Sequence, residues 1–285
     1  MQSSDFSQRS RVIMMGIALV MGAFLVIVAP ILIQATLSGL MEEIATLLPE
    51  QPGMRMPTIL LPIWFFIFRG LAVLAGVTLL VTAGEIRKGR SWSWPLCLTC
   101  LSIPALTGVF ISLPYLVQFG KPAPAALVLV LSLIAYFWVL LLKIEDRVTK
   151  VARVVTFALL GIVPAHVIVL VNHGIKELIV RPEHPLFSDP MTTIYGFETP
   201  LNFFVFLFCV AAIPLLAAGK EADWWLGLIA GVTAVIANYP THFIRMQTSD
   251  FFVGGTLGLL LVISLVYPGF RRRIGVFSEQ DRTAA

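Results

Sequence analysis

The sequence has little charge and few cysteines. Only 13% of its 285 residues are Asp, Glu, Lys or Arg, whereas 58% are hydrophobic, and the mean hydropathy is +0.91. Soluble domains carry about a quarter charged residues, so this composition excludes a water-soluble globular protein and predicts that the bilayer is the solvent. The three cysteines, Cys97, Cys100 and Cys209, lie in apolar runs. They predict no disulfide framework, and packing is the favoured role for the Cys97–Cys100 pair.

Long apolar runs leave no room for a soluble domain. A helix needs about 20 predominantly apolar residues to cross a bilayer, and the sequence predicts eight such spans. The runs are 12–33, 58–83, 96–117, 124–142, 154–171, 200–218, 224–240 and 251–268. The first run is too long for a signal peptide and has no small-residue cleavage site after it, so we expect a signal-anchor helix. The predicted fold is an all-α, polytopic membrane helix bundle with eight transmembrane helices.

Basic residues are unevenly divided between the two sides that these spans define. With the N-terminus in the cytoplasm, fourteen Lys and Arg fall on inner segments and five on outer ones. The outer five are Arg55, Lys121, Lys176, Arg181 and Arg245. This bias places both termini in the cytoplasm, and we expect the membrane to be a bacterial cytoplasmic membrane. The basic balance therefore reflects membrane anchoring, and no nucleic-acid partner is predicted.

Residues 1–90 are expected to form an N-terminal part with two spans and an amphipathic segment at 38–50. In that segment apolar and acidic residues alternate at helical spacing, which predicts a helix lying on the outer membrane surface. Arg69 lies near the middle of the second span, where a charged side chain costs about 2.5–3.5 kcal/mol. Either it has a partner or a wet cavity, with Glu42 and Glu43 as candidate partners, or it snorkels to an interface.

The remainder is expected to divide into a core at 91–270 and a basic cytoplasmic tail at 271–285. Near the end of the core, the stretch "FFVGGTLG" places Gly254 and Gly258 four residues apart, beside Gly255. Small residues at this spacing let two helices approach closely in lipid. The sequence therefore predicts close helix packing at these glycines.

Polar chemistry in the second half gathers in three stretches predicted on the outer side: 172–190, 195–204 and 238–258. The intervening helices would bring these stretches together above the bundle. The side chains that would then share one space are His173, Lys176, Arg181, His184, His242 and Arg245. Clustered Lys and Arg favour an anionic ligand, because Arg can bind phosphate through two parallel hydrogen bonds. At a membrane surface the expected anion is a lipid phosphate.

Three motifs in these stretches carry a family resemblance. They are "IKELIVRPEHP", "GFETPLNFF" and "YPTHFIRMQTSDFFVGGTLG". In order and placing they resemble the motifs of the type 2 phosphatidic acid phosphatases, the membrane branch of the superfamily that also holds vanadium haloperoxidases. The family's motifs are Lys, six residues, Arg-Pro; then Pro-Ser-Gly-His; then Ser-Arg, five residues, His, three residues, Asp. The resemblance covers about residues 96–268 and implies a six-helix core with its site on the outer face.

The resemblance also implies catalytic roles, and this chain lacks most of the residues that would perform them. In the family the third-motif His attacks phosphorus, its Asp orients it, and the second-motif His protonates the leaving alcohol. Lys176 and Asp250 match the catalytic set, and Arg181 matches the first Arg of an extended first motif. The departures are the motif Arg (Glu183, or His184 with one insertion), Pro-Ser-Gly-His (Glu198, Thr199, Pro200, Leu201), Ser-Arg (Tyr239, Pro240) and the nucleophilic His (Met246).

We therefore expect a degenerate member that does not hydrolyse phosphate esters by the family's route. It would bind a lipid phosphate through Lys176, Arg181 and Arg245, or act as a non-catalytic subunit of a membrane complex, without a cofactor. The alternative is an active lipid or polyprenyl phosphate phosphatase with a rearranged site. In that case His242 or His173 would be the nucleophile and Asp250 the orienting acid.

Two further alternatives are weaker. His173, Glu183 and His184 could hold a metal ion, but their spacing alone gives little support, and no metal site is predicted. A transporter ranks last, because the sequence shows no inverted repeat and one intramembrane charge, Arg69. The expected partners are membrane lipids, with lipid phosphates first; other membrane proteins or further copies of the chain stay open.

Overall fold

The computed structural model describes residues 6–50, 55–143, 145–180, 190–218, 221–246 and 248–274. Over these ranges the chain is helical and contains no strand, which confirms the predicted all-α class. Six helices in the described ranges are long and apolar enough to cross a membrane, and two apolar helices are shorter. The six are Gln8–Leu47, Pro57–Lys88, Ser93–Phe119, Arg147–Leu178, Thr193–Ala218 and Trp224–Arg245.

Contacts between helices divide the chain into two compact units, residues 1–144 and 145–285. The boundary expected between residues 90 and 91 lies inside the first unit, because the third and fourth helices of that unit pack against its N-terminal helices. The motif-bearing stretches of the second half all belong to the second unit.

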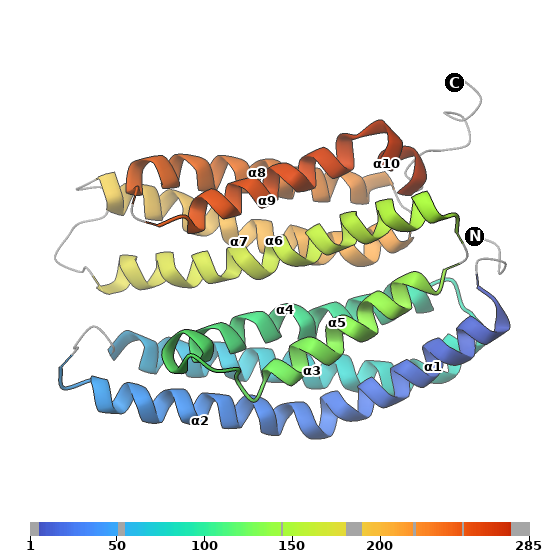
Figure 1. Ribbon diagram of the computed structural model, residues 1–285, viewed down its shortest axis with the longest axis horizontal. Helices are drawn as coiled ribbons and strands as arrows, with labels where there is room; N and C mark the ends of the chain where they lie inside the picture. The colour runs from blue at the N-terminus through green and yellow to red at the C-terminus, as the bar shows by residue number, and fades with distance from the viewer. Residues whose placement is uncertain are drawn as a thin grey trace. The chain divides into compact units, whose positions relative to one another are not determined.

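The first unit contains one very long helix followed by three others (Figure 1). Its elements are α1 (Gln8–Ala23), the π-helical turn η1 (Phe24–Val28), α2 (Ala29–Leu47), α3 (Arg55–Lys88), α4 (Ser93–Phe119) and α5 (Ala126–Leu141). Each helix packs against the next, and α5 returns to contact α1. Residues 38–47, expected as a separate surface helix, instead continue α2 without a break from the first span.

The second unit contains four long helices and a short one (Figure 1). Its elements are α6 (Arg147–Val180), α7 (Pro190–Ala218), α8 (Glu221–Arg245), α9 (Asp250–Val266) and α10 (Pro268–Ile274). Each of α6 to α9 packs against the next, and α9 returns to α6, so these four close an up-and-down bundle. We call the end where α6 and α8 finish and α7 and α9 begin the polar end of the second unit.

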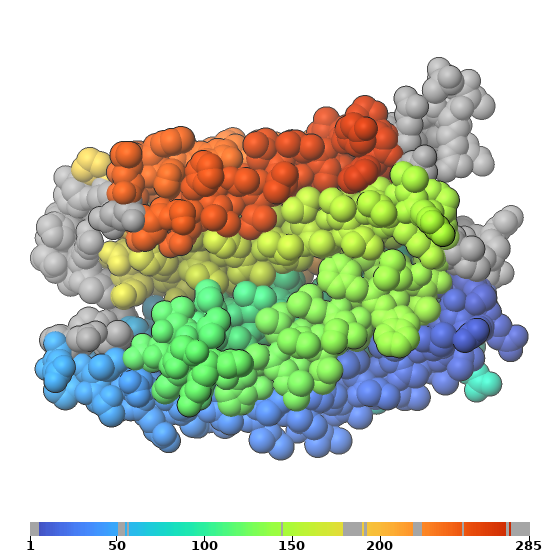
Figure 2. Space-filling model, in the orientation of Figure 1, coloured from blue at the N-terminus to red at the C-terminus, as the bar shows by residue number. Residues whose placement is uncertain are grey.

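Glycines let α8 and α9 lie in close contact (Figures 1 and 2). A Cβ added at Gly258 would lie 2.7 Å from the Ala234 Cβ and 2.8 Å from the Gly231 carbonyl oxygen. A Cβ at Gly255 would lie 2.8 Å from the Tyr239 ring. No side chain fits at either position unless the helices separate, which confirms the close packing predicted from the glycine spacing.

Arg69 has a hydrogen-bonded partner inside the first unit. Its Nη1 donates to the Oε1 of Gln34 on α2 at 2.8 Å, and its guanidinium lies 5.0 Å from the centre of the Phe66 ring. Of the two alternatives drawn from the sequence, the structure therefore selects a partner over snorkelling alone. The partner is Gln34 and not Glu42 or Glu43, because Gln34 lies on the part of the long helix that packs beside the middle of α3.

The cysteines behave as packing residues. Cys97, Cys100 and Cys209 are all free thiols and all buried. Cys97 and Cys100 belong to α4, the most extensively buried helix of the first unit. This agrees with the prediction of packing for the Cys97–Cys100 pair and of no disulfide framework.

Candidate functional site

A buried polar network crosses from α7 to α8 near the polar end. Glu198 and Asn202 on α7 and Asn238 on α8 have no exposed surface. Asn202 Nδ2 donates to Glu198 Oε2 at 2.5 Å and to Asn238 Oδ1 at 3.1 Å. Asn238 Nδ2 donates in return to Asn202 Oδ1 at 3.0 Å, and the Thr199 hydroxyl donates to Glu198 Oε1 at 3.0 Å. Every oxygen of the buried carboxyl group thus accepts a hydrogen bond from a neutral donor.

Local sequence explains how this network forms. Glu198 and Asn202 are four residues apart, so both project from the same face of α7. Two glycines on neighbouring helices make the room: a Cβ at Gly174 of α6 would lie 1.9 Å from Thr199 Oγ1 and 2.6 Å from Glu198 Oε1. On α9, a Cβ at Gly254 would lie 3.0 Å from Asn238 Cγ. The backbones of α6 and α9 therefore approach the polar side chains directly.

Aromatic residues surround His173 on α6. Its Nε2 lies 3.4 Å from the Tyr195 hydroxyl of α7, and its ring stands edge-on to Tyr195 and Phe251. Tyr195, Phe251 and Leu170 form a small buried cluster. His173 is thereby held between α6, α7 and α9.

Charged residues mark the ends of α8 and α9. Arg245 Nη1 donates to Thr248 Oγ1 at 3.1 Å, and that hydroxyl donates to Asp250 Oδ2 at 3.0 Å. The Arg245 guanidinium also lies 5.4 Å from the centre of the Phe251 ring. Its Nε is buried and has no hydrogen-bond partner among the described residues. Asp250 opens α9, where the helix dipole favours a negative charge.

Electrostatic interactions join these groups. His173 interacts with Arg245, Glu177, Lys176 and Asp250, and Glu198 interacts with Arg245. Two cations and three carboxyl groups thus act at one end of one bundle. Clustered ionisable residues of this kind are rare in membrane proteins and mark functional sites.

Neither His242 nor His173, the two histidines proposed with Asp250, forms a hydrogen bond or ion pair with its carboxylate in the part of the chain that the structure describes. His173 Nε2 instead lies 3.4 Å from the Tyr195 hydroxyl. His242 Nδ1 lies 3.2 Å from the Thr248 carbonyl oxygen, and Thr248 in turn bonds the Asp250 side chain. His166 Nε2 lies 2.9 Å from the Asp250 backbone oxygen. Met246, which stands at the position expected from the motif resemblance to hold a nucleophilic His, is exposed and takes a left-handed φ of 45° at the end of α8. No histidine–carboxylate dyad is formed by these residues.

The structure brings together four of the residues singled out from the sequence: His173, Lys176, Arg245 and Asp250. His242 lies at the same end but contacts Thr248 instead. Arg181, Glu183 and His184 lie outside the described residues. In the ranges that the structure covers, no group of three or more His, Cys, Asp and Glu side chains could hold a metal ion.

Sequence reasoning missed the Glu198–Asn202–Asn238 network. The sequence marks Glu198 only as a departure from a motif, and Asn238 only as the first residue of the stretch 238–258, at the end of the predicted span 224–240. Polar residues four apart at the start of an apolar run were the available signal, because such residues in a span usually face the bundle interior.

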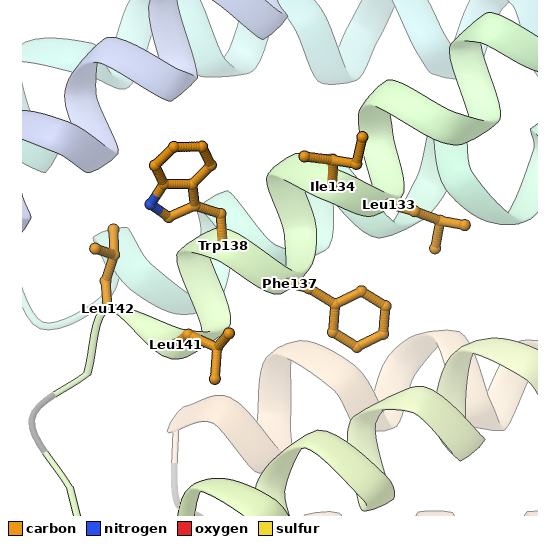
Figure 3. Close-up of a pocket in the computed structure, with 6 residues that line it drawn as sticks. All are labelled: Leu133, Ile134, Phe137, Trp138, Leu141 and Leu142. Carbon is orange, nitrogen blue, oxygen red and sulfur yellow. The ribbon is translucent and has the colours of Figure 1, made fainter.

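The first unit offers a surface of a different kind. Apolar side chains of α5 line a shallow groove, with Ile134 and Trp138 on one side of the helix and Phe137 and Leu141 on the other (Figure 3). Leu133 and Leu142 complete it. The groove carries no polar group suited to chemistry, and its lining is that of a lipid-facing helix.

Fold and site together define a multi-pass membrane protein of the all-helical class, with a polar, ionisable cluster at one end of its second unit. Comparison of the chain with protein-family models, with curated proteins and with solved structures returns no match.

Proposed function

We propose that the protein spans the membrane eight times and binds a phosphate-bearing lipid headgroup at the polar end of its second unit, without hydrolysing it. The single observation that carries this proposal is Arg245. Its Nε donor is buried and has no acceptor among the described residues. Lys176 on α6 adds a second positive charge, and both charges act on His173. A phosphate oxygen is the acceptor that Arg binds best.

Eight spans require that the two shorter apolar helices also cross. Ala126–Leu141 and Asp250–Val266 have 16 and 17 residues, close to the lower limit of about 17 for a spanning helix. With eight spans, both termini lie on one side, and the excess of Lys and Arg favours the cytoplasm as that side. The proposed membrane is the cytoplasmic membrane of a bacterial cell. The polar end then faces outward, at the level of the lipid headgroups.

The contacts of the candidate catalytic groups support the proposed lack of hydrolysis. A histidine nucleophile needs an orienting acid, and the Asp250 side chain is bonded to Thr248. Met246 replaces the family's nucleophile. Kinship with the type 2 phosphatidic acid phosphatases stays a prediction that depends on the order of the motifs. The family's six-helix core would include helices from both units of this chain.

Lipid binding is tested with the purified full chain in bilayer nanodiscs, by native mass spectrometry of retained lipids. We expect phosphatidic acid to be retained in preference to phosphatidylcholine. Arg245→Gln should reduce that preference about tenfold or more, since a hydrogen bond to a charged group contributes about 1.5–3 kcal/mol. Lys121→Gln, in another predicted outer loop, is the matched control and should change nothing. Equal retention of both lipids by the wild type would contradict the proposal.

The alternative of an active phosphatase is favoured by one observation: His173 lies among Lys176, Arg245 and Asp250. The same preparation is therefore assayed for phosphate release from phosphatidic acid and from a polyprenyl diphosphate. We expect none from the wild type or from Met246→His. Turnover that His173→Ala or His242→Ala abolishes would replace the binding proposal with a hydrolase.

A further inference from the structure

The two units repeat one pattern of buried residues. On the second helix of each unit one row of buried positions follows the same spacing of four, three, four, three and four residues. In α3 they are Leu61, Phe65, Phe68, Ala72, Ala75 and Leu79; in α7 they are Glu198, Asn202, Val205, Cys209, Ala212 and Leu216.

The first and fourth helices repeat in the same way. In the first helix, one row of buried positions has the same spacing in both units: Met14, Ala18, Met21, Leu25, Ala29, Ile33 and Thr36, and then Thr149, Arg153, Thr156, Leu160, Pro164, Ile168 and Val171. In the fourth helix, counted from its N-cap in the first unit, such a row is Ala125, Val128, Ser132, Ala135 and Val139, and then Phe251, Gly254, Gly258, Leu261 and Leu265. Just beyond the first set, "SGLMEEI" at 38–44 corresponds to "HGIKELI" at 173–179.

A tryptophan at the start of the third helix repeats together with its partners. Trp94 Nε1 of α4 donates to the Val139 carbonyl oxygen at 3.2 Å, and Trp224 Nε1 of α8 donates to the Leu265 carbonyl oxygen at 2.9 Å. A cation covers each indole: Lys143 at 5.2 Å from Trp94 and Arg271 at 4.4 Å from Trp224. Val139 and Leu265 are the corresponding positions of the fourth helices. The chain therefore carries one four-helix design twice.

This repetition makes the first unit an internal control for the second. Where α7 has Glu198 and Asn202, α3 has Leu61 and Phe65, all four of them buried. Counting from the repeated tryptophans, Asn238 corresponds to Gly108, also buried. The first unit thus has apolar residues in its core at the three positions where the second unit has polar ones. The polar network is an addition to the fold and not a requirement of it.

From this we propose that Glu198 is a reversible proton-binding site inside the second unit. Two opposed effects act on its carboxyl group. Complete burial within an apolar span favours the neutral acid. Donors from Thr199 and Asn202, together with the nearby positive charge of Arg245, favour the carboxylate. Because neither state is left without support, one proton from solvent can add to a carboxylate oxygen and leave again with no other covalent bond changed.

Titratable and charged groups stand on each helix at this end. They are His166, His173, Lys176 and Glu177 on α6, His242 and Arg245 on α8, and Asp250 on α9. The positive charge of Arg245 acts on both Glu198 and His173. The proposal stands on the burial and bonding of Glu198 and does not depend on lipid-phosphate binding.

The test is infrared spectroscopy of the reconstituted full chain between about pH 5 and pH 9, the range in which buried carboxyls exchange protons. We expect a carboxylic acid C=O band that diminishes as the pH rises and that is lost in Glu198→Gln. Glu177→Gln, on the facing helix but half-buried, is the matched control and should retain the band.

If Glu198→Gln does not fold, Glu198→Leu takes its place, since the first unit carries leucine at this position. A titrating band that survives removal of Glu198 would overturn the proposal. So would a Glu198-dependent band of constant intensity, or no such band, at every pH: the carboxyl would then be fixed in one state and purely structural.

Discussion

Asn202 on α7 and Asn238 on α8 exchange two amide hydrogen bonds, each Nδ2 donating to the partner's Oδ1, at 3.1 and 3.0 Å. Both side chains are fully buried. In an apolar medium the hydrophobic effect does not hold helices together, so close packing provides most of the attraction between helices and polar pairs of this kind add to it. This reciprocal pair joins α7 to α8 and presents Asn202 to Glu198.

The asparagine pair should show energetic coupling. Asn202→Ala and Asn238→Ala each leave the other amide without its partner, so the double variant should lose less than the sum of the two single losses. We expect a coupling free energy of about 0.6–1.7 kcal/mol, as for other interhelical hydrogen bonds in membranes. The free energy of unfolding is measured for the wild type, the two single variants and the double variant by titration with SDS in mixed micelles. Strict additivity would show that the two amides do not interact.

Gly174 should tolerate no side chain while Thr199 is present. In Gly174→Ala the new Cβ would lie 1.9 Å from Thr199 Oγ1, and the resulting overpacking should cost about 1–3 kcal/mol of unfolding free energy. The double variant Gly174→Ala/Thr199→Ala removes the closest atom and should recover part of that loss, because Glu198 Oε1 at 2.6 Å still crowds the new Cβ. Gly161→Ala on the same helix meets nothing within 4 Å and should be neutral. A neutral Gly174→Ala would contradict the close approach of α6 to α7.

Arg69 and Gln34 should respond unequally to removal. Gln34→Leu leaves the Arg69 guanidinium without its hydrogen-bond acceptor and should cost about 1–3 kcal/mol. Arg69→Leu removes the costly charge itself and leaves a Gln34 amide that still reaches Ser38 Oγ at 3.4 Å, so its effect should be smaller or stabilising. The same SDS titration compares the two. Equal losses would indicate that Arg69 is anchored by other groups.

Sequence reasoning predicted the helices well because long apolar runs leave the chain little choice in a bilayer. It placed their ends too close to the apolar centres. The first span, predicted as 12–33, belongs to a helix from Gln8 to Leu47, and the sixth, predicted from residue 200, begins at Pro190. Hydropathy marks the lipid-facing part of a helix and not the polar turns that continue it. Pro200 is accommodated inside α7, as prolines often are in membrane helices.

The candidate site was only partly within reach of the sequence. Successive spans cross the membrane in opposite directions, and this alone predicts that Lys176 and Arg245 lie at the same end of a bundle. The contacts of Asp250 with Thr248, and of Asn202 with Asn238, depend on the rotation of each helix about its axis, which tertiary packing decides. The division at residue 144 likewise reflects which helices pack together, a property that no local pattern encodes.

The central claim is that the second unit carries a polar site on a scaffold that the first unit completes with apolar residues. Its most direct test is a reciprocal exchange at corresponding positions, Glu198→Leu and Leu61→Glu, with the unfolding free energy measured for each full-length variant. We predict that Glu198→Leu loses less than about 1 kcal/mol or gains stability, because it restores the apolar residue of the repeat. Leu61→Glu should lose about 2.5 kcal/mol or more, because it buries a carboxyl group in a span that lacks the matching asparagines. A large loss for Glu198→Leu, equal to that for Leu61→Glu, would contradict the account by showing that the network holds the fold together.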